Sequence, residues 1–288
     1  MPNTHVILDW DGTITDIDCE SQSFQELYPQ LFCERLGIDQ KKYNTVFDEL
    51  RDDVLSDPGL GFEILGHDVV PAAADPYLLT QKTIQVTLQR LRDGSLDVAH
   101  TDLPDDESAF LIDLYKDAVG RAENDAYFRE GKDTTKRFLD DLIANRDVAI
   151  VTNSSTAKVE AQLGELGYTN EDISQFTIRG NAKKLFVTPT YDGLPDEVTP
   201  PGFPRAVQLR RGHYHYVLND LEQQGYLPES TAVVGDCYEL DLALPEVLGY
   251  ATVQFATPFT PEHERAYNEA KETISFVRTY GELSEALC

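Results

Sequence analysis

Two aspartates separated by one residue stand at the end of a short apolar stretch. Residues 6–8, Val-Ile-Leu, favour a buried strand, and the stretch stops at Asp11-Gly12, a pair typical of sharp turns. Residues two apart in a strand project to the same side, so Asp9 and Asp11 can share a site, or one can present its backbone carbonyl instead. Such a pair needs a proton or a hard cation such as Mg²⁺. The alternative interpretation is a strand that ends in a solvated, Asp-rich turn.

Polar residues follow two further apolar runs. Thr152 and Asn153 come directly after the run at 148–151, and Asp236 follows the run at 231–234, with Asp241 five residues later. Alone, Thr152-Asn153 is typical of a helix N-cap, and Asp241 of an acidic residue in the first turn of a helix. Because ligands of parallel sheets bind beyond the carboxyl ends of the strands, we expect these side chains to converge with Asp9.

The elements that position these residues are predicted by hydrophobic periodicity. From Phe128 onward, apolar strand-like runs alternate with amphipathic helical segments, which favours a parallel sheet with helices on both faces. Strands are expected at 6–8, 148–151, 176–178, 231–234, 251–255 and 274–278, and helices at 133–145, 156–166, 216–224 and 240–248.

Residues 16–127 have a different pattern. Apolar residues recur at helical spacing over 21–36, 43–55, 77–91 and 108–119, and a break rich in Pro and Gly holds the short apolar piece Phe62–Leu65. The chain is therefore expected to have two domains. Residues 1–15 and 128–288 form the α/β core, and 16–127 form an α-helical domain inserted after the first strand.

The ordered motifs resemble those of the haloacid dehalogenase (HAD) superfamily, specifically its aspartate-nucleophile phosphatases. They are Asp9-Trp10-Asp11-Gly12-Thr13, the strand ending at Thr152-Asn153, a downstream basic residue, and Gly235-Asp236 with Asp241. The resemblance covers residues 5–15 and 128–288. It implies a Rossmann-like, doubly wound core, a mobile helical cap inserted after the first motif, and Mg²⁺-dependent phosphoryl transfer.

The resemblance also implies a role for each matching residue. Asp9 is expected to be the nucleophile, and Asp11 the general acid and base, with its backbone carbonyl on Mg²⁺. Asp9 and Asp236 would supply carboxylates to Mg²⁺, and Asp241 a further ligand or support for one. Thr152, with backbone amides around Asn153, is expected to bind phosphoryl oxygens.

The basic residue of the third motif is less clearly placed. Lys183 and Lys184 closely follow the strand at 176–178, whereas Arg210 and Arg211 precede the helix at 216–224. A hairpin is expected between them, with arms at 185–188 and 205–209. Lys183 is favoured as the catalytic and phosphate-binding cation, with Arg210 as the main alternative.

The composition narrows the class of partner. The 288 residues carry 51 acidic and 24 basic side chains, a formal charge of −27. Such a charge disfavours nucleic acids and anionic membranes and is compatible with adaptation to high salt. Four scattered cysteines, and no visible secretion signal or apolar span, favour a cytoplasmic protein with reduced thiols.

These observations predict a Mg²⁺-dependent phosphatase that forms an aspartyl-phosphate and acts on a small phosphorylated metabolite. A phosphomutase would use the same core residues, and a non-catalytic binding or regulatory protein could keep the fold. Dehalogenase chemistry is disfavoured because Asp11 and the acidic fourth motif suit a metal-dependent phosphoryl reaction. Cys237 is expected to be a small buried residue, and His213 and His215 are not expected to form a metal site.

Overall fold

The computed structural model describes residues 4–64, 66–122, 126–188 and 193–288. The chain divides into two compact units, which are described separately. Unit 1 contains residues 1–16, 63–70 and 126–288, and unit 2 contains residues 17–62 and 71–125. No helix among the described residues is both long and apolar enough to cross a bilayer.

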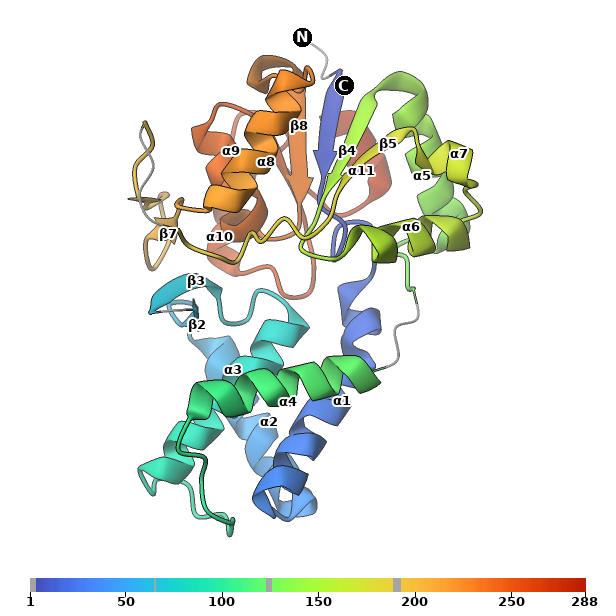
Figure 1. Ribbon diagram of the computed structural model, residues 1–288. Helices are drawn as coiled ribbons and strands as arrows, with labels where there is room; N and C mark the ends of the chain where they lie inside the picture. The colour runs from blue at the N-terminus through green and yellow to red at the C-terminus, as the bar shows by residue number, and fades with distance from the viewer. Residues whose placement is uncertain (1–3, 65, 123–125, 189–192) are drawn as a thin grey trace. The chain divides into compact units, whose positions relative to one another are not determined.

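A six-stranded, all-parallel sheet forms the centre of unit 1 (Figure 1), with the strand order β10-β9-β8-β1-β4-β5. The predicted α/β fold class is therefore confirmed. Five predicted apolar runs coincide with strands, and the sixth is shorter than expected. The strands are β1 (His5–Leu8), β4 (Asp147–Val151), β5 (Phe176–Arg179), β8 (Thr231–Gly235), β9 (Ala251–Phe255) and β10 (Phe276–Val277).

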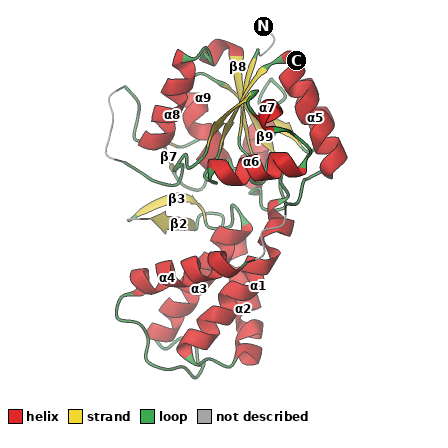
Figure 2. Cartoon of the chain, turned by 45° about the vertical axis from the view of Figure 1, so that its right-hand side comes forward, coloured by secondary structure: helices red, strands yellow, loops and turns green. Residues whose placement is uncertain are grey.

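Helices cover both faces of this sheet (Figure 2). Alternate strand residues face opposite ways, so Val6 and Leu8 of β1 pack with α5, α6 and α11, whereas Ile7 packs with α8 and α9. The helices are α5 (Lys132–Asn145), α6 (Thr156–Glu165), α7 (Asn170–Ile173), α8 (Gly212–Gln223), α9 (Ala243–Val247), α10 (Glu262–Glu269) and α11 (Tyr280–Ala286). A 3₁₀ turn spans Pro228–Ser230, and a π-helical turn spans Tyr238–Leu242.

The hairpin predicted after β5 is only partly correct. Its second arm contains β7 (Val207–Gln208), but the partner strand is β6 (Glu197–Val198), antiparallel to β7. Residues 185–188 belong to no strand. The Thr188 N–H instead donates to Arg210 O at 2.8 Å.

Unit 2 has a core of its own, made by four helices. Aromatic residues of α1, including Phe24 and Phe32, pack with Tyr43 of α2, Ile84 of α3 and Leu114 of α4. Aspartates cap α2, α3 and α4 by accepting an N–H in the first turn. The helices are α1 (Ile17–Leu36), α2 (Gln40–Ser56), α3 (Pro76–Arg92) and α4 (Glu107–Arg121).

The segment predicted as a purely helical insertion also contains two strands. β2 (Gly61–Ile64) pairs with β3 (His67–Pro71), and both strands cross the boundary between the units. Leu65, the end of the predicted apolar piece, lies outside the described residues. The chain leaves and re-enters unit 1 through adjacent segments, because Thr15 and Phe128 form an antiparallel bridge.

Candidate active site

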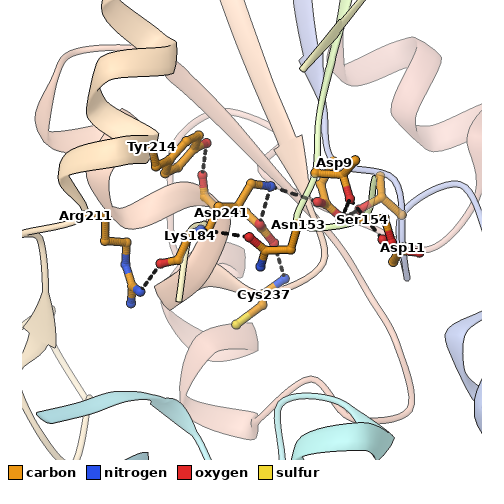
Figure 3. Close-up of polar contacts among 11 residues, drawn as sticks. Asp9, Asp11, Asn153, Ser154, Lys184, Arg211, Tyr214, Cys237 and Asp241 are labelled. Atoms are coloured by element: carbon orange, nitrogen blue, oxygen red, sulfur yellow. Dashed lines mark hydrogen bonds and ion pairs between the residues drawn. The ribbon is translucent and has the colours of Figure 1, made fainter. Parts of the chain in front are cut away.

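The first two aspartates lie where β1 ends. The Asp9 N–H still pairs with the sheet, donating to Val234 O at 2.8 Å. Trp10 projects away into the core, where its Nε1 donates to Gln162 Oε1 at 2.5 Å. Trp10 O then accepts the N–H groups of residues 13–15, and Gly12 has a φ of +80°. This tight turn keeps Asp9 and Asp11 at the end of the strand (Figure 3).

The fourth motif follows β8 as a π-helical turn. Asp236 comes directly after the strand, and the Ala243 N–H donates to Tyr238 O, five residues earlier. The turn brings Asp241 back against the strand end, where its Oδ2 accepts the Cys237 N–H at 3.1 Å and its backbone O accepts the Tyr214 hydroxyl at 2.8 Å. Single π turns are frequent at functional sites.

Two glycines make this close approach of carboxylates feasible. A Cβ at Gly12 would lie 2.2 Å from Asp236 Oδ2, and a Cβ at Gly235 would lie 2.4 Å from the Asp241 Cβ. Any side chain at either position would displace a carboxylate of the fourth motif. The tips of the neighbouring strands β1 and β8 are thus packed directly on each other.

The lysine that reaches these carboxylates is Lys184. Its Nζ lies 2.8 Å from Asp9 Oδ1 and 2.8 Å from Asp241 Oδ1, and its side chain is 1% exposed. Lys183, the cation favoured from the sequence, is exposed, whereas its neighbour Lys184 is buried. Arg210, the alternative, lies near Asp196 and Gln208 instead.

The loops after β4 and β5 hold Lys184 in place. Its N–H donates to Asn153 Oδ1 at 2.8 Å, and its carbonyl accepts Arg211 Nη1 at 2.5 Å. The Ala182 N–H donates to Thr152 O at 2.9 Å. Asn153 was predicted to offer backbone amides to a phosphoryl group, but its side chain acts here as a brace for the loop that carries the lysine.

The Asp11 side chain is held apart from the other aspartates. Its Oδ2 accepts the Thr152 hydroxyl at 2.9 Å, and its Oδ1 lies 2.6 Å from Lys158 Nζ. Thr152 Oγ1 in turn accepts the Ser154 N–H at 3.1 Å. Lys158 was not predicted. Its only sequence signal is its place in the first turn of the helix that follows Thr152-Asn153.

Burial dominates the electrostatics of the site. Desolvation raises the pKa of Asp9 to about 7, while the Lys184 ammonium opposes this shift. For Lys184, burial acts to lower the pKa, but the Asp241 and Asp9 carboxylates outweigh it and raise the pKa above its ordinary value. Lys184 therefore stays charged. Burial also raises the pKa of the Cys237 thiol well above its usual range, in keeping with a packing role.

Three of the four predicted metal ligands lie close together. Asp9, Asp236 and Asp241 each offer a carboxylate oxygen, and these oxygens lie within 4.8 Å of one another. All three residues are buried. Hard oxygen donors of this kind suit Mg²⁺. The Asp11 side chain is not part of this set, because it contacts Thr152 and Lys158 instead.

Comparisons with known proteins identify the fold. No protein-family model matches the sequence, and no curated protein matches it either. Solved structures match over nearly the full length of the chain. YfnB from Bacillus subtilis, assigned as a HAD hydrolase and bound to magnesium, is 15% identical, with 100% of this chain and 99% of that chain covered and a TM-score of 0.51. The chain has the haloacid dehalogenase-like fold.

Two other solved structures share the HAD-like fold. CbbY from Rhodobacter sphaeroides, in complex with phosphate, is 15% identical, with 99% of each chain covered and a TM-score of 0.50. A predicted phosphoglycolate phosphatase from Haemophilus somnus is 14% identical, with 98% of this chain and 97% of that chain covered and a TM-score of 0.51. At these identities, the similarity establishes the HAD-like fold and not the substrate.

Proposed function

We propose that this chain is a Mg²⁺-dependent phosphatase that hydrolyses a small phosphomonoester through an aspartyl-phosphate on Asp9. The observation that carries the proposal is the cluster of Asp9, Asp236 and Asp241 carboxylates, with Lys184 Nζ paired to Asp9 and Asp241. The Asp11 side chain is held separately by Thr152 and Lys158. Two similar folds are described with magnesium or with phosphate bound, which supports the same reaction class.

The side chains divide the chemistry between them. An Asp9 carboxylate oxygen attacks phosphorus, and the bond from phosphorus to the leaving oxygen breaks as Asp11 donates a proton to that oxygen. Asp11 then takes a proton from water, whose oxygen attacks the aspartyl-phosphate and releases phosphate with Asp9 restored. Lys184 and Thr152 stabilise negative charge on the transferring group. Mg²⁺ on Asp9 and Asp236, supported by Asp241, would neutralise phosphoryl oxygens.

The decisive experiment measures phosphate release from a panel of phosphorylated metabolites, with and without Mg²⁺. We expect Asp9→Asn to abolish turnover while far-UV circular dichroism stays unchanged. Asn145→Asp, at the exposed end of α5, is the surface control. Activity that persists in chelator would contradict the metal role. Isomerisation without phosphate release would indicate a phosphomutase, and an inert but correctly folded protein would favour the binding role.

A further inference from the structure

A second cluster of metal-ligand side chains lies behind the π-helical turn. Glu239 of that turn and His263 and Glu264 of α10 each offer one ligand atom, and these atoms lie within 4.8 Å of one another. Glu239 is 1% exposed and Glu264 is fully buried. None of the three belongs to the proposed catalytic cluster.

Each of these residues has a buried polar atom without a partner. Glu239 Oε1, Glu264 Oε1 and His263 Nε2 have no hydrogen-bond partner in the part of the chain that the structure describes. The opposite carboxylate oxygens are fixed: Glu239 Oε2 accepts Arg205 Nη2 at 2.7 Å, and Glu264 Oε2 accepts the Tyr238 N–H at 3.0 Å. The two carboxylates are therefore oriented, with one oxygen of each left over.

Such an arrangement is costly without a ligand. An unsatisfied buried polar group costs about 1–3 kcal/mol, and the cluster contains three such atoms. His263 adds a buried ring nitrogen, Nε2, to the two carboxylates, and a neutral imidazole is the form that binds metal ions.

We propose that Glu239, His263 and Glu264 bind a divalent transition-metal ion such as Zn²⁺ or Mn²⁺. The choice of metal follows from the donor atoms, which are two carboxylate oxygens and one imidazole nitrogen. Carboxylate oxygens alone would suit Mg²⁺ or Ca²⁺, whereas an imidazole nitrogen favours transition metals. Arg205 already neutralises part of the Glu239 charge, so binding depends on the free oxygens and on His263.

The second site would position the fourth motif. Gln254 Nε2 donates to Glu264 Oε2 at 2.6 Å and to Asp236 O at 2.9 Å, and Glu239 lies two residues before Asp241. An ion bound to Glu239 and Glu264 would tie the π-helical turn to α10. It would thereby fix the backbone that carries Asp236 and Asp241, without touching substrate.

The test is calorimetric titration of the chelator-treated, full-length chain with Zn²⁺ and separately with Mn²⁺. An Asp236→Asn background weakens the catalytic cluster and leaves the second site intact. In that background we expect one equivalent of ion to bind and the thermal unfolding midpoint to rise. His263→Gln and Glu264→Gln should each weaken this binding by at least about tenfold.

His215→Gln, at a half-buried histidine of α8, is the matched control and should bind the ion like its parent. Weak sites on the acidic surface would appear equally in every variant. Circular dichroism of each variant establishes that it is folded before titration. The proposal is overturned if folded Asp236→Asn protein binds no stoichiometric ion, as expected if the two glutamates share a proton instead. It is also overturned if His263→Gln leaves the affinity unchanged.

Discussion

Lys184 is one cation held between two buried carboxylates. Its ammonium lies 2.8 Å from both Asp9 and Asp241, so it compensates charge that would otherwise be expensive to bury. Lys183, next to it, points to solvent and makes a natural comparison.

Lys184→Met keeps the length of the side chain and removes the charge. We expect kcat/KM for phosphate release to fall by about 100-fold or more, and stability to fall by roughly 3–5 kcal/mol. Lys183→Met should change stability by no more than about 0.5 kcal/mol. Steady-state kinetics and urea unfolding measure both. Equal effects of the two substitutions would exclude the assignment of Lys184.

Gly12 gives a second test at the scale of one residue. Gly12→Ala places a methyl group where Asp236 Oδ2 lies, and it also strains a positive φ. Gly167→Ala has a comparable φ of +91° but open space around the added methyl group.

Both glycine variants should lose about 1–3 kcal/mol of stability from backbone strain. Only Gly12→Ala should also lose activity, by about 100-fold, because it displaces a proposed metal ligand. Measuring kcat/KM under conditions in which both variants are equally folded separates the loss of activity from the loss of stability. Full activity in Gly12→Ala would mean that the position of Asp236 does not matter.

At the scale of elements, two buried glutamates lie where the π-helical turn meets β9 and α10: Glu239 of the turn and Glu264 of α10. Burial, and then repulsion by Glu239, raises the pKa of Glu264 to about 8. The ordinary value of 4.5 applies in the unfolded chain. Between these pH values the folded protein keeps a proton that the unfolded chain releases.

The stability that the folded protein gains by holding the Glu264 proton is complete below about pH 4.5, and it is lost as the pH rises through about 8. In chelator-treated protein, we expect this group to lower the free energy of unfolding by a few kcal/mol over that interval. Urea unfolding from pH 5 upward should show a flatter curve for Glu264→Gln. Glu262→Gln, exposed on the same helix, should follow the parent. Parallel curves for Glu264→Gln and the parent would disprove the shift.

Strands were predicted from the sequence more accurately than the residues of loops. Apolar runs located β1, β4, β8 and β9 because most residues of these strands are buried on both faces, and the edge strand β5 was located by its short run from the buried Phe176. The choice between Lys183 and Lys184 had no such signal. It depends on the loop after β5, where the φ of Lys183 is +49° and Asn153 braces the next residue. The π-helical turn likewise depends on distant contacts, such as the Tyr214 hydroxyl on Asp241 O and Glu264 on the Tyr238 N–H.

For the whole molecule, the charge of −27 is the dominant electrostatic property. Mutual repulsion of surface carboxylates opposes the compact state, and salt screens it. We expect the unfolding midpoint to rise between about 0.1 M and about 1 M NaCl, as the screening length falls from about 10 Å to about 3 Å. An uncharged osmolyte at matched osmolality is the control. A midpoint independent of salt would argue against adaptation to high salt.

The place of β1 in the sheet has a consequence for synthesis of the chain. β1 is made first, yet it pairs with β4, about 140 residues later, and with β8, more than 220 residues later. At typical rates of translation, its apolar residues wait on the order of 10 s for their first partner and longer for the second. The nascent chain thus carries an unpaired, aggregation-prone strand while unit 2 is made, so its yield should depend on chaperones.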